Sequence, residues 1–435
     1  MKSYSFHIKT YGCQMNVADS ELVAGILSNA GYIQTDTIEQ ADIILFNSCT
    51  VRQHAEDRVL GRITTEARRK EDNPNMLIGL IGCVAQRKCE QLLEEIDSLD
   101  FVVGTDQYRQ LPDIISSCLK DKKPLFADVQ NNIENYENIY PVRNRGVNAF
   151  VTIMRGCNNF CSYCIVPYVR GRERSRDHTE IFNEIEKAGM DGFKDITLLG
   201  QNVNSYDDGI LTFPELLQQA SHIGSIERLR FVTSHPKDLS DKVIDVMAQE
   251  PKLCEHLHLP MQSGSDRILQ KMNRNYTAEK YLEIINKLRN AMPQIALTTD
   301  VMVGFPGETE EEFLHTYNLM KEIRFDYAFM FKYSPRDGTE AAGYQDQIPE
   351  EIRLERLQKL IDQQEIITFE KYQEQIGRTV EVYVEQVSKK SDKELSGRTL
   401  DNKIAVFQGG KNLISSFVKI KIVDATGWTL KGKQI

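Results

Sequence analysis

The chain has no apolar run long enough to span a membrane. Its first residues, MKSYSFHIKTYGC, offer neither a long apolar stretch nor a small-residue cleavage site. Membrane-spanning helices and a secretory signal peptide are therefore not expected. These absences predict a cytoplasmic protein with no membrane partner, in which thiols stay reduced. Nine cysteines in such a chain favour metal binding or redox chemistry over disulfides. Internal repeats and low-complexity tracts are absent as well.

Positive charge is also scarce, since 53 Lys and Arg face 63 Asp and Glu for a net charge of −10. This balance disfavours a broad nucleic-acid surface, because phosphate binding uses clustered Lys and Arg. Residues 378–433 are the exception, with eleven Lys and Arg against six Asp and Glu. This local excess of positive charge allows RNA binding by one part of the chain. The candidate phosphate contacts there are Lys419, Lys421, Lys431 and Lys433. Trp428, Phe407 and Phe417 could stack on bases, although core positions explain them at least as well.

A chain of 435 residues is too long for a single core, and its patterning predicts three α/β or β regions joined in series. Residues 1–120 alternate β-rich runs with helical stretches such as SELVAGILSNAG, for which Ser20 and Gly31 are plausible caps. This alternation predicts a small parallel α/β domain. Residues 121–146 are polar, with Pro and Asn, and are typical of a linker.

Residues 147–375 repeat the alternation and predict a partial (βα)6 barrel, two units short of a closed eight-stranded one. The expected strands are AFVTIMRG, DITLLGQN, RLRFVTS, HLHLPMQS, ALTTDVMVGF and YAFMFKYS. The charged amphipathic run PEEIRLERLQKLIDQQEIITFEKYQEQIG predicts one long helix. Residues 376–435 change to period two, in RTVEVYVEQV, NKIAVFQG and SSFVKIKIVDATGWTLKGK, which predicts a small all-β module.

Three cysteines lie within the stretch RGCNNFCSYC, and no fourth accompanies them. Cys157, Cys161 and Cys164 follow the first barrel strand, so we expect them on a loop at the carboxyl mouth of the barrel. A closed structural zinc site needs four ligands, whereas three thiolates can hold a 4Fe–4S cluster and leave one iron open. A zinc site completed by a distant histidine and three unpaired core cysteines are the alternatives. Cysteines bunched among Asn, Ser and Arg are not typical of core packing.

A second set of three cysteines comes at the carboxyl ends of expected strands. Cys13 ends SFHIKTYGC, Cys49 ends ADIILFNSC and Cys83 ends MLIGLIGC. If these strands are parallel neighbours, the three thiols meet at the sheet edge where open α/β sheets bind ligands. One such cysteine would usually be a small buried hydrophobe, but three in the same context favour a second three-thiolate cluster. The remaining cysteines have no such context and are interpreted as structural: Cys89, Cys118 and Cys254.

The stretch RGCNNFCSYCIVPYVRGRERSR resembles the cluster-binding signature of the radical S-adenosylmethionine methylthiotransferases. The resemblance covers nearly the whole chain. It implies that the first region is the family's N-terminal cluster domain and the last its TRAM module, an RNA-binding β-barrel. NSCTVRQHAEDRV, SHPKDL, LPMQSGSDRIL and VGFPGETEEEF resemble the tRNA-acting branch rather than the branch that modifies a ribosomal protein.

The resemblance implies methylthiolation of C2 of N6-isopentenyladenosine next to the anticodon of tRNA. That carbon has no leaving group and no acidic proton, so the reaction needs a radical supplied by cofactors. The implied cofactors are S-adenosylmethionine, as radical source and methyl donor, and two 4Fe–4S clusters. The cluster on Cys157, Cys161 and Cys164 would bind S-adenosylmethionine, and that on Cys13, Cys49 and Cys83 would deliver sulfur. The expected partners of a monomeric enzyme are tRNA, a reducing electron-transfer protein and a sulfur source.

Weaker site candidates follow the first signature and one barrel strand. Arg170, Arg172, Arg174 and Arg176 could bind tRNA phosphates or the cofactor carboxylate, or they could form a solvated face paired with Glu173 and Asp177. Gly304 and Gly307 could allow close approach of a cofactor, although glycine turns are common. Structural histidines are a better explanation than ligands for the residues near strand ends: His235, His256 and His258.

Two other functions remain open at this point. Within the family, the rival substrate is threonylcarbamoyl-adenosine in tRNA or a ribosomal protein. From a different class, the rival is a non-catalytic RNA-binding protein that holds zinc. A brown protein with about eight iron per chain after anaerobic purification would favour two clusters, and a colourless protein with zinc would favour the rival.

Overall fold

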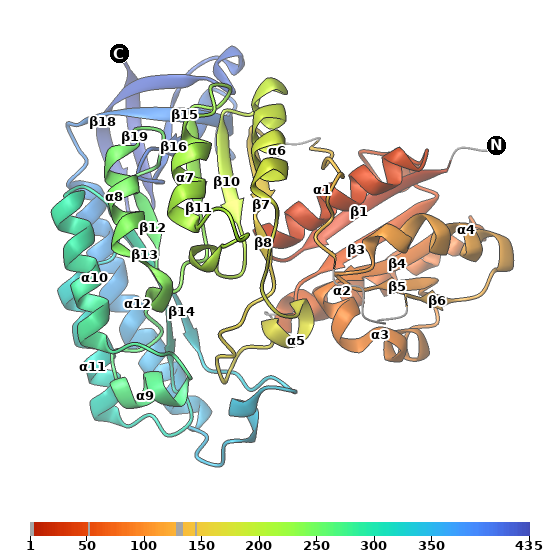
Figure 1. Cartoon of the computed structure of the whole chain (residues 1–435), viewed down its shortest axis with the longest axis horizontal. Coiled ribbons are helices and arrows are strands. Elements are labelled where there is room, and N and C mark those ends of the chain that lie inside the picture. Colours follow the sequence, from red (N-terminus) through yellow and green to blue (C-terminus); the bar gives the residue numbers. More distant parts are fainter. Residues whose placement is uncertain (1–3, 51–52, 128–133, 144–145) are drawn as a thin grey trace. The chain divides into compact units, whose positions relative to one another are not determined.

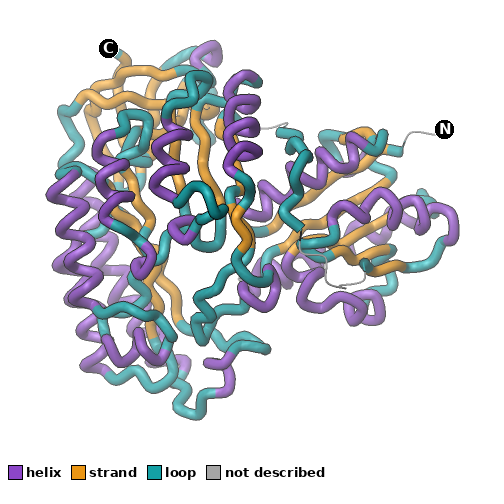
Figure 2. The backbone as a smooth tube through the Cα atoms, viewed as in Figure 1, coloured by secondary structure: helices purple, strands orange, loops and turns teal. Residues whose placement is uncertain are grey.

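The computed structural model of the chain describes residues 4–50, 53–127, 134–143 and 146–435, and for residues 53–55 it describes the backbone alone. The chain forms two compact units. The first unit consists of Met1–Asn144, Met154–Asn158 and Ile165–Arg176, and the second of Arg145–Ile153, Asn159–Cys164 and Asp177–Ile435. Figure 2 shows strands and helices alternating along most of the chain, as the sequence predicts. Among the described residues, no helix combines the length and apolarity that crossing a membrane requires.

The first unit is a parallel sheet with helices on both faces (Figure 1, red to orange). Its strands lie in the order β2-β1-β3-β4-β5-β6. The strands are β1 (Ser5–Tyr11), β2 (Ile33–Gln34), β3 (Ile43–Ser48), β4 (Leu77–Gly82), β5 (Phe101–Val103) and β6 (Leu125–Phe126). The helices are α1 (Gln14–Asn29), α2 (Gln53–Ala67), α3 (Cys83–Glu95) and α4 (Leu111–Asp121). The three predicted strands are confirmed as β1, β3 and β4, and each ends one or two residues before its cysteine.

Alternating side chains of the central strands fill two separate cores. On β3, Ile43 and Leu45 join a core that includes residues of α1 and α4. Ile44 and Phe46 join a second core with residues of α2 and α3. Because a fully buried parallel strand needs apolar residues on both faces, its sequence is a continuous apolar run rather than an alternating one. This is why IILF predicts the strand without showing which side is buried.

Two local predictions for this unit need correction. Ser20 is not a helix cap, because α1 begins six residues earlier with Cys13 as its N-cap. Ser20 is instead buried, and its hydroxyl accepts a hydrogen bond from Asn47 Nδ2 at 2.9 Å. The predicted linker contributes β6 to the sheet and a buried aromatic side chain, Tyr136, to the core. Residues 128–133 and 144–145 of the predicted linker, and residues 51–52 of the NSCTVRQHAEDRV motif, lie outside the described residues.

The same unit includes three short elements from the segment after Met154. They are β8 (Met154–Arg155), α5 (Val166–Arg170) and β9 (Arg174–Ser175). β8 and β9 form an antiparallel pair, with Arg155 opposite Arg174. Residues 165–176 thus pack with the N-terminal sheet although they follow the first barrel strand in sequence.

The second unit contains all six predicted barrel strands, and that prediction is confirmed (Figure 1, yellow to blue). They are β7 (Asn148–Thr152), β10 (Asp195–Leu199), β11 (Arg228–Phe231), β12 (His256–His258), β13 (Ala296–Val303) and β14 (Tyr327–Lys332). The helices are α6 (His178–Met190), α7 (Phe213–Ser221), α8 (Asp241–Gln249), α9 (Asp266–Lys271), α10 (Ala278–Ala291), α11 (Glu310–Ile323) and α12 (Glu350–Gln373). All strand pairs are parallel, in two sheets ordered β11-β10-β7 and β12-β13-β14. An isolated parallel bridge pairs Leu229 of β11 with Leu253, which precedes β12.

The end of the chain forms a closed five-stranded barrel, here called the C-terminal barrel. Its strands are β15 (Thr379–Val387), β16 (Glu394–Thr399), β17 (Ile404–Gln408), β18 (Phe417–Thr426) and β19 (Thr429–Gln434). The sequence pattern misses β16, ELSGRT, because a glycine and polar residues hide its alternation. Position 397 on this strand is glycine because a Cβ there would come within 2.0 Å of Tyr383 O.

Buried polar contacts fix the C-terminal barrel to the amino ends of the parallel strands. Lys403 Nζ lies 2.9 Å from Asp326 Oδ1, and both side chains are buried. Arg230 donates to Thr399 O at 3.2 Å, and Arg228 donates to Arg398 O at 2.9 Å. Breaking a buried pair leaves an uncompensated charge at a cost of about 3–5 kcal/mol. The all-β module is therefore part of the fold of the second unit rather than an appendage.

Candidate functional site

The second cysteine set meets at the carboxyl edge of the N-terminal sheet. β3 pairs in parallel with both β1 and β4, with Ser48 opposite Tyr11 on one side and Gly82 on the other. Cys49 N donates to Tyr11 O at 3.0 Å, which continues the ladder one residue beyond the strands. The expectation that the three strands are parallel neighbours is thus confirmed. The sheet order reverses between β1 and β3, and such a switch point is where open α/β sheets bind ligands.

A glycine and two asparagines make the close approach at this edge possible. A Cβ on Gly12 would lie 2.7 Å from the Cβ of Cys49, so a larger residue would push Cys49 away. Asn16 Nδ2 donates to Asn47 Oδ1 at 3.0 Å, and Asn47 Nδ2 donates to Asn16 O at 2.8 Å. This reciprocal pair ties the start of α1 to the end of β3. Local motifs predict the cysteines but give no sign of these supporting residues.

The thiols at this edge differ electrostatically from one another. Cys13 caps α1 and Cys83 is the first residue of α3, and helix N-termini favour thiolates. A hydrogen bond with the Cys49 thiol is the main cause that lowers the pKa of Cys13 to about 6. Burial raises the pKa of Cys83, and it raises that of Cys118 to about 11 and that of Cys254 to about 12. Because metals bind thiolates, Cys13 is the thiol of this edge whose pKa favours the metal-binding form.

A buried ion-pair network lies beside these thiols. Asp19 accepts from Arg155 Nη2 at 2.8 Å and from Arg170 Nη2 at 2.7 Å, and all three side chains are buried. Arg170 Nε also donates to Cys83 Sγ at 3.3 Å. Arg155 lies over the ring of Tyr136 at 4.7 Å, which closes the far side of the network. Neither Asp19 nor Arg155 carries a sequence signal, because only the fold brings them together.

The network corrects the interpretation of the arginine cluster. Arg170 is 4% exposed and ion-paired, so it is neither a phosphate contact nor part of a solvated face in this structure. Arg174 pairs with Asp106 at 2.7 Å, and Arg176 is buried. Arg172 is exposed. Of the four arginines, Arg172 alone keeps the exposure that phosphate binding needs.

The loop cysteines are held by backbone contacts on both of their flanks. Gly156 has φ +78°, and a Cβ there would lie 2.0 Å from Arg172 O, so this position requires glycine. Cys157 N donates to Gly171 O at 3.1 Å. Further along, Cys164 N donates to Cys161 O at 2.9 Å, and Ser162 N donates to Met272 O at 3.1 Å. The segment after α9 thus anchors the second half of the loop.

Arg274 is the residue of this segment that contacts a thiol. Its Nη1 donates to Cys161 Sγ at 3.5 Å, and its Nη2 donates to Pro260 O at 3.2 Å. Its guanidinium lies 5.3 Å from the ring centre of Tyr276. The sequence KMNRNYT gives no sign of this role, since Arg274 is distant from the cysteine motif in the chain.

Gly304 and Gly307 have a structural reason to be glycine. Both have positive φ, +68° and +77°. A Cβ on Gly304 would lie 2.3 Å from Arg353 Cγ, and one on Gly307 would lie 2.2 Å from Asp346 Oδ2. Side chains of the same unit therefore fill the space beside each glycine. The prediction that these residues contact a cofactor stays a prediction.

The face of β14 opposite α12 presents aromatic side chains. Ala328 is buried where α12 packs on the strand, whereas Phe329 and Phe331 remain 42% and 39% exposed. His258 stacks edge-on against Phe329 with ring centres 5.9 Å apart, and His258 Nε2 lies 3.5 Å from Asp300. Exposed apolar residues beside titratable ones on a strand face are typical of a ligand surface. The sequence analysis predicted the strand but did not single out its aromatics.

The histidines near strand ends have structural partners, as predicted. His258 Nδ1 lies 3.0 Å from Thr298 Oγ1, and His256 Nε2 lies 3.1 Å from the same hydroxyl. His235 Nδ1 accepts from Lys237 N at 3.2 Å and caps a short helix. Burial lowers the pKa of His256 to about 3 and that of His235 to about 2, so both are neutral near pH 7.

The lysines of the C-terminal barrel lie on its outer surface. Lys419, Lys421, Lys431 and Lys433 are exposed. Lys419 and Lys421 alternate along β18 with buried residues such as Ile420. Lys421 lies directly opposite Lys433 across the β18–β19 pair, whereas Lys431 is paired with Asp424 at 3.0 Å. Adjacent like charges on one surface are suited to phosphates.

The three aromatic candidates have different environments. Phe407 is 2% exposed in the core of the C-terminal barrel, so it cannot stack on a base. Phe417 lies against Tyr383 with ring centres 4.7 Å apart, and Arg228 lies over its ring at 4.7 Å. Trp428 is 45% exposed and contacts Tyr327 edge-on. Trp428 is therefore the remaining candidate for base stacking.

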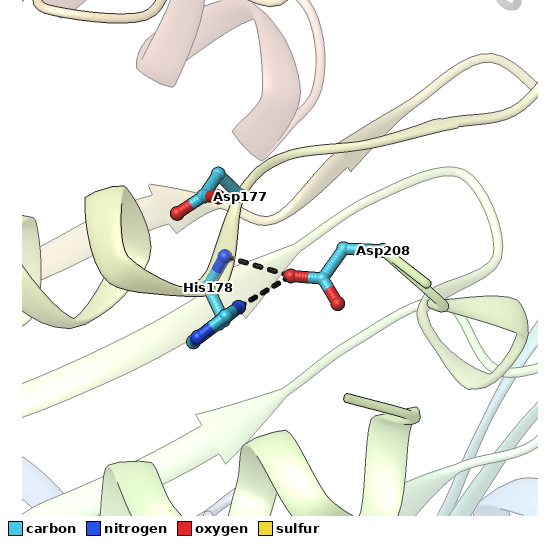
Figure 3. A group of neighbouring side chains, drawn as sticks. All are labelled: Asp177, His178 and Asp208. Carbon is cyan, nitrogen blue, oxygen red and sulfur yellow. Dashed lines mark hydrogen bonds and ion pairs between the residues drawn. The ribbon is translucent and has the colours of Figure 1, made fainter. Parts of the chain in front are cut away.

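Among the described residues, one group of side chains places three possible metal-ligand atoms within 4.8 Å of one another (Figure 3). Its hydrogen bonds give it a structural role. It consists of Asp177, His178 and Asp208. Asp177 caps α6 by accepting from Thr179 N and Glu180 N. Asp208 accepts from His178 Nδ1 at 2.6 Å and from Leu211 N at 2.8 Å. These bonds already use the oxygens, and they explain why the pKa of Asp208 lies well below its usual range.

Comparison with known families divides the chain into three matched segments. Residues 5–104 match the uncharacterized protein family UPF0004. Residues 151–320 match the Radical SAM superfamily, and residues 373–435 match the TRAM domain.

Curated relatives match the chain from end to end. The tRNA-2-methylthio-N(6)-dimethylallyladenosine synthase of Thermoanaerobacter sp. (strain X514) is 48% identical over 440 aligned residues, covering 100% of this chain and 93% of the relative. The synthase of Phocaeicola vulgatus is 45% identical and covers 98% of this chain and 95% of its own length. That of Clostridium botulinum (strain Langeland) is 45% identical, with 99% and 97% covered.

Solved structures share the fold at low identity. The radical S-adenosylmethionine methyltransferase TsrM from Kitasatospora setae, solved with cobalamin and a 4Fe–4S cluster, is 13% identical with a TM-score of 0.58. The likeness covers 78% of this chain and 77% of TsrM. The cobalamin-dependent enzyme OxsB is 12% identical with a TM-score of 0.51, covering 83% of this chain and 56% of OxsB. At such identity, these similarities concern the fold alone.

Proposed function

Because this chain belongs to the family of tRNA-2-methylthio-N(6)-dimethylallyladenosine synthases, we propose that it adds a methylthio group to C2 of N6-isopentenyladenosine next to the anticodon of tRNA. The observation that carries the proposal is the pairing of two features in one chain. A three-cysteine loop follows a barrel strand, and three further cysteines follow neighbouring parallel strands. End-to-end similarity to enzymes of this name supports the choice over the rival substrates.

Membership of the Radical SAM superfamily implies a 4Fe–4S cluster and S-adenosylmethionine. We assign Cys157, Cys161 and Cys164 to that cluster, and Cys13, Cys49 and Cys83 to a second one. The donor set fits, because both groups combine thiols with a buried arginine that donates to one sulfur. When bound, these cofactors supply the radical that removes hydrogen from an aromatic carbon, together with the sulfur and the methyl group.

The protein's own part is to hold ligands and to position the substrate. Arg274 and the segment after α9 keep the second half of the cysteine loop in place. Phe329 and Phe331 offer an apolar surface suited to the isopentenyl group, and His258, which contacts Thr298 and Asp300, packs edge-on against Phe329. Gly304 and Gly307 remain candidates for the cofactor's approach.

The C-terminal barrel is proposed to bind tRNA phosphates through its exposed lysines, with Arg172 as a further candidate and Trp428 as a stacking residue. Phosphate contacts provide affinity but little sequence information. The tRNA-modifying relatives and the TRAM match support tRNA as the partner. A reducing electron-transfer protein, a sulfur source, a monomeric state and a cytoplasmic location remain proposals. So do the domain boundaries at 1–120, 147–375 and 376–435.

The experiment that tests this function is mass spectrometry of tRNA nucleosides from a deletion strain. Without the gene, N6-isopentenyladenosine should accumulate, and complementation should restore its methylthio derivative. Complementation with Cys161→Ala or Cys49→Ala should fail to restore it. Restored modification of threonylcarbamoyl-adenosine or of a ribosomal protein instead would contradict the substrate. A protein purified anaerobically with zinc and no iron would contradict the enzyme class.

A further inference from the structure

The guanidinium of Arg170 contacts both an acid and a candidate cluster ligand. Its Nη2 lies 2.7 Å from Asp19 Oδ2, and its Nε donates to Cys83 Sγ at 3.3 Å. The Asp19 carboxylate is fully buried and is shared with Arg155. A buried carboxylate fixes a planar guanidinium in one orientation. The N–H group that points to the sulfur is therefore already in position before a cluster binds.

The network carries more positive than negative charge. Two arginines share one carboxylate, so the group of Arg155, Arg170 and Asp19 has a net charge of +1 in a buried setting. Such an excess is costly unless a negative group lies nearby. The thiols of Cys13, Cys49 and Cys83 are the neighbours that become negative when they bind metal.

Three buried donors of the first unit have no partner in the described part of the chain. Arg170 Nη1, Ser48 Oγ and Thr50 Oγ1 are buried and have no hydrogen-bond partner among the described residues. Ser48 and Thr50 flank Cys49 in sequence. Buried donors without partners are uncommon and call for an explanation. Arg170 Nη1 belongs to the guanidinium that already contacts Cys83, so sulfur held at this edge would be an acceptor for it.

We propose that Arg170 is a positioning residue of the second cluster, whose guanidinium, fixed by Asp19, donates to the Cys83 sulfur and offers its remaining N–H group to sulfur held beside it. The inference rests on the proposed second cluster. Hydrogen bonds from an arginine to ligand sulfurs stabilise the more negative, reduced state of a cluster. Arg170 therefore makes the second cluster easier to reduce and holds Cys83 in its ligand position.

Arg155 provides a matched control. It binds the other oxygen of the same carboxylate, at 2.8 Å, and it is equally buried. Its loss should disturb folding about as much as loss of Arg170, but no hydrogen bond from Arg155 to a cysteine is found among the described residues. Any effect specific to Arg170 is then due to its contact with sulfur.

The test uses the full chain with Cys157, Cys161 and Cys164 replaced by alanine, so that only the sheet-edge set can bind a cluster. Mediated titration with dithionite, followed by electron paramagnetic resonance, gives the reduction potential. Arg170→Lys and Arg170→Gln should each lower the equilibrium constant for reduction about tenfold, or about 59 mV for a one-electron couple. Arg155→Lys and Arg155→Gln should change it less than about threefold, or about 30 mV on the same scale.

A second measurement does not depend on substitution at Arg170. With 15N-labelled arginine, pulsed electron paramagnetic resonance of the reduced cluster should show a nitrogen coupling, because Nε lies 3.3 Å from the ligand sulfur. The coupling should persist in Arg155→Lys and vanish in Arg170→Lys. Absence of the coupling in the labelled parent overturns the inference even if the Arg170 variants fail to fold.

The outcomes separate this inference from the function on which it rests. A parent protein without iron overturns the second cluster and the role of Arg170 together. A parent with about four iron per chain, but with equal potentials in the Arg170 and Arg155 variants, overturns the role of Arg170 alone.

Discussion

One set of cysteines occupies a single loop, whereas the other is assembled from three strand ends far apart in the sequence. Cys157, Cys161 and Cys164 lie within eight consecutive residues of the chain. Cys13 and Cys83 come close because β1 and β4 both pair with β3. The loop set depends on local backbone contacts and on the segment after α9, and the sheet-edge set depends on the register of a whole sheet.

The arginine beside each set differs in the same way. Arg274, beside Cys161, is held by neutral groups, Pro260 O and Tyr276. Arg170, beside Cys83, is held by a buried carboxylate that it shares with a second arginine. A short motif brings its cysteines together within a few residues, but in both sets an arginine from elsewhere in the chain contacts one thiol.

Replacing one loop cysteine should give the largest effect. Cys161→Ala should abolish cleavage of S-adenosylmethionine, because the loop set would lose one of its three ligands. Iron should fall from about eight to about four per chain, since the sheet-edge set remains. Iron analysis and measurement of 5′-deoxyadenosine check both points. Loss of all iron would mean that the two sets do not bind metal independently.

The converse change should separate the two roles. Cys49→Ala should leave 5′-deoxyadenosine formation intact while methylthiolated product disappears, because only the proposed sulfur-delivering site is damaged. Chromatography of both products from one reaction measures the ratio. Product at the wild-type yield would show that the sheet-edge set does not deliver sulfur.

A substitution that leaves every cysteine in place can test the importance of the sheet edge. Gly12→Ala puts a Cβ 2.7 Å from the Cβ of Cys49, and such overpacking costs about 1–3 kcal/mol. The second cluster should be lost or unstable, and the iron content should fall to about four per chain. Gly61→Ala is the control, because nothing lies within 4 Å of its Cβ position on α2. That variant should keep its iron and gain roughly 0.5–1 kcal/mol of stability. Equal iron in the two variants would contradict the packing argument.

The smallest effect is expected from charges outside both cysteine sets. Neutralising Lys419, Lys421, Lys431 and Lys433 together should weaken tRNA binding and lower the salt slope by about 1 for each phosphate that the barrel no longer binds. Iron content should not change, since none of these lysines belongs to either set. Filter binding at several salt concentrations measures the slope.

The matched control neutralises four exposed lysines on helices around the parallel strands of the second unit: Lys187, Lys242, Lys280 and Lys321. It removes the same net charge from a different surface. If both quadruple variants bind tRNA equally, the overall charge of the protein governs binding rather than the C-terminal barrel. Arg172 then becomes the better candidate for a specific phosphate contact. Removing the whole module is a poorer test, because Asp326 and Arg230 would lose buried partners.

The sequence by itself determined the features that depend on short-range patterns. Continuous apolar runs located β3 and β4, and period-two alternation located most of the C-terminal barrel. The C-x3-C-x2-C spacing located the loop set. Such signals act within a few residues, where strand geometry and loop length alone restrict what the chain can do.

Only the tertiary structure decided which polar residues meet in the interior. Arg170 looks like one of four equivalent arginines in YVRGRERSR, yet Asp19 draws it into a buried network. Ser20 looks like a helix cap, yet α1 begins six residues earlier and has Cys13 as its N-cap. Phe407 looks like a base-stacking candidate, yet it fills a core. Burial and pairing are set by long-range contacts, and residues that meet across a fold leave no mark on their immediate neighbours in the chain.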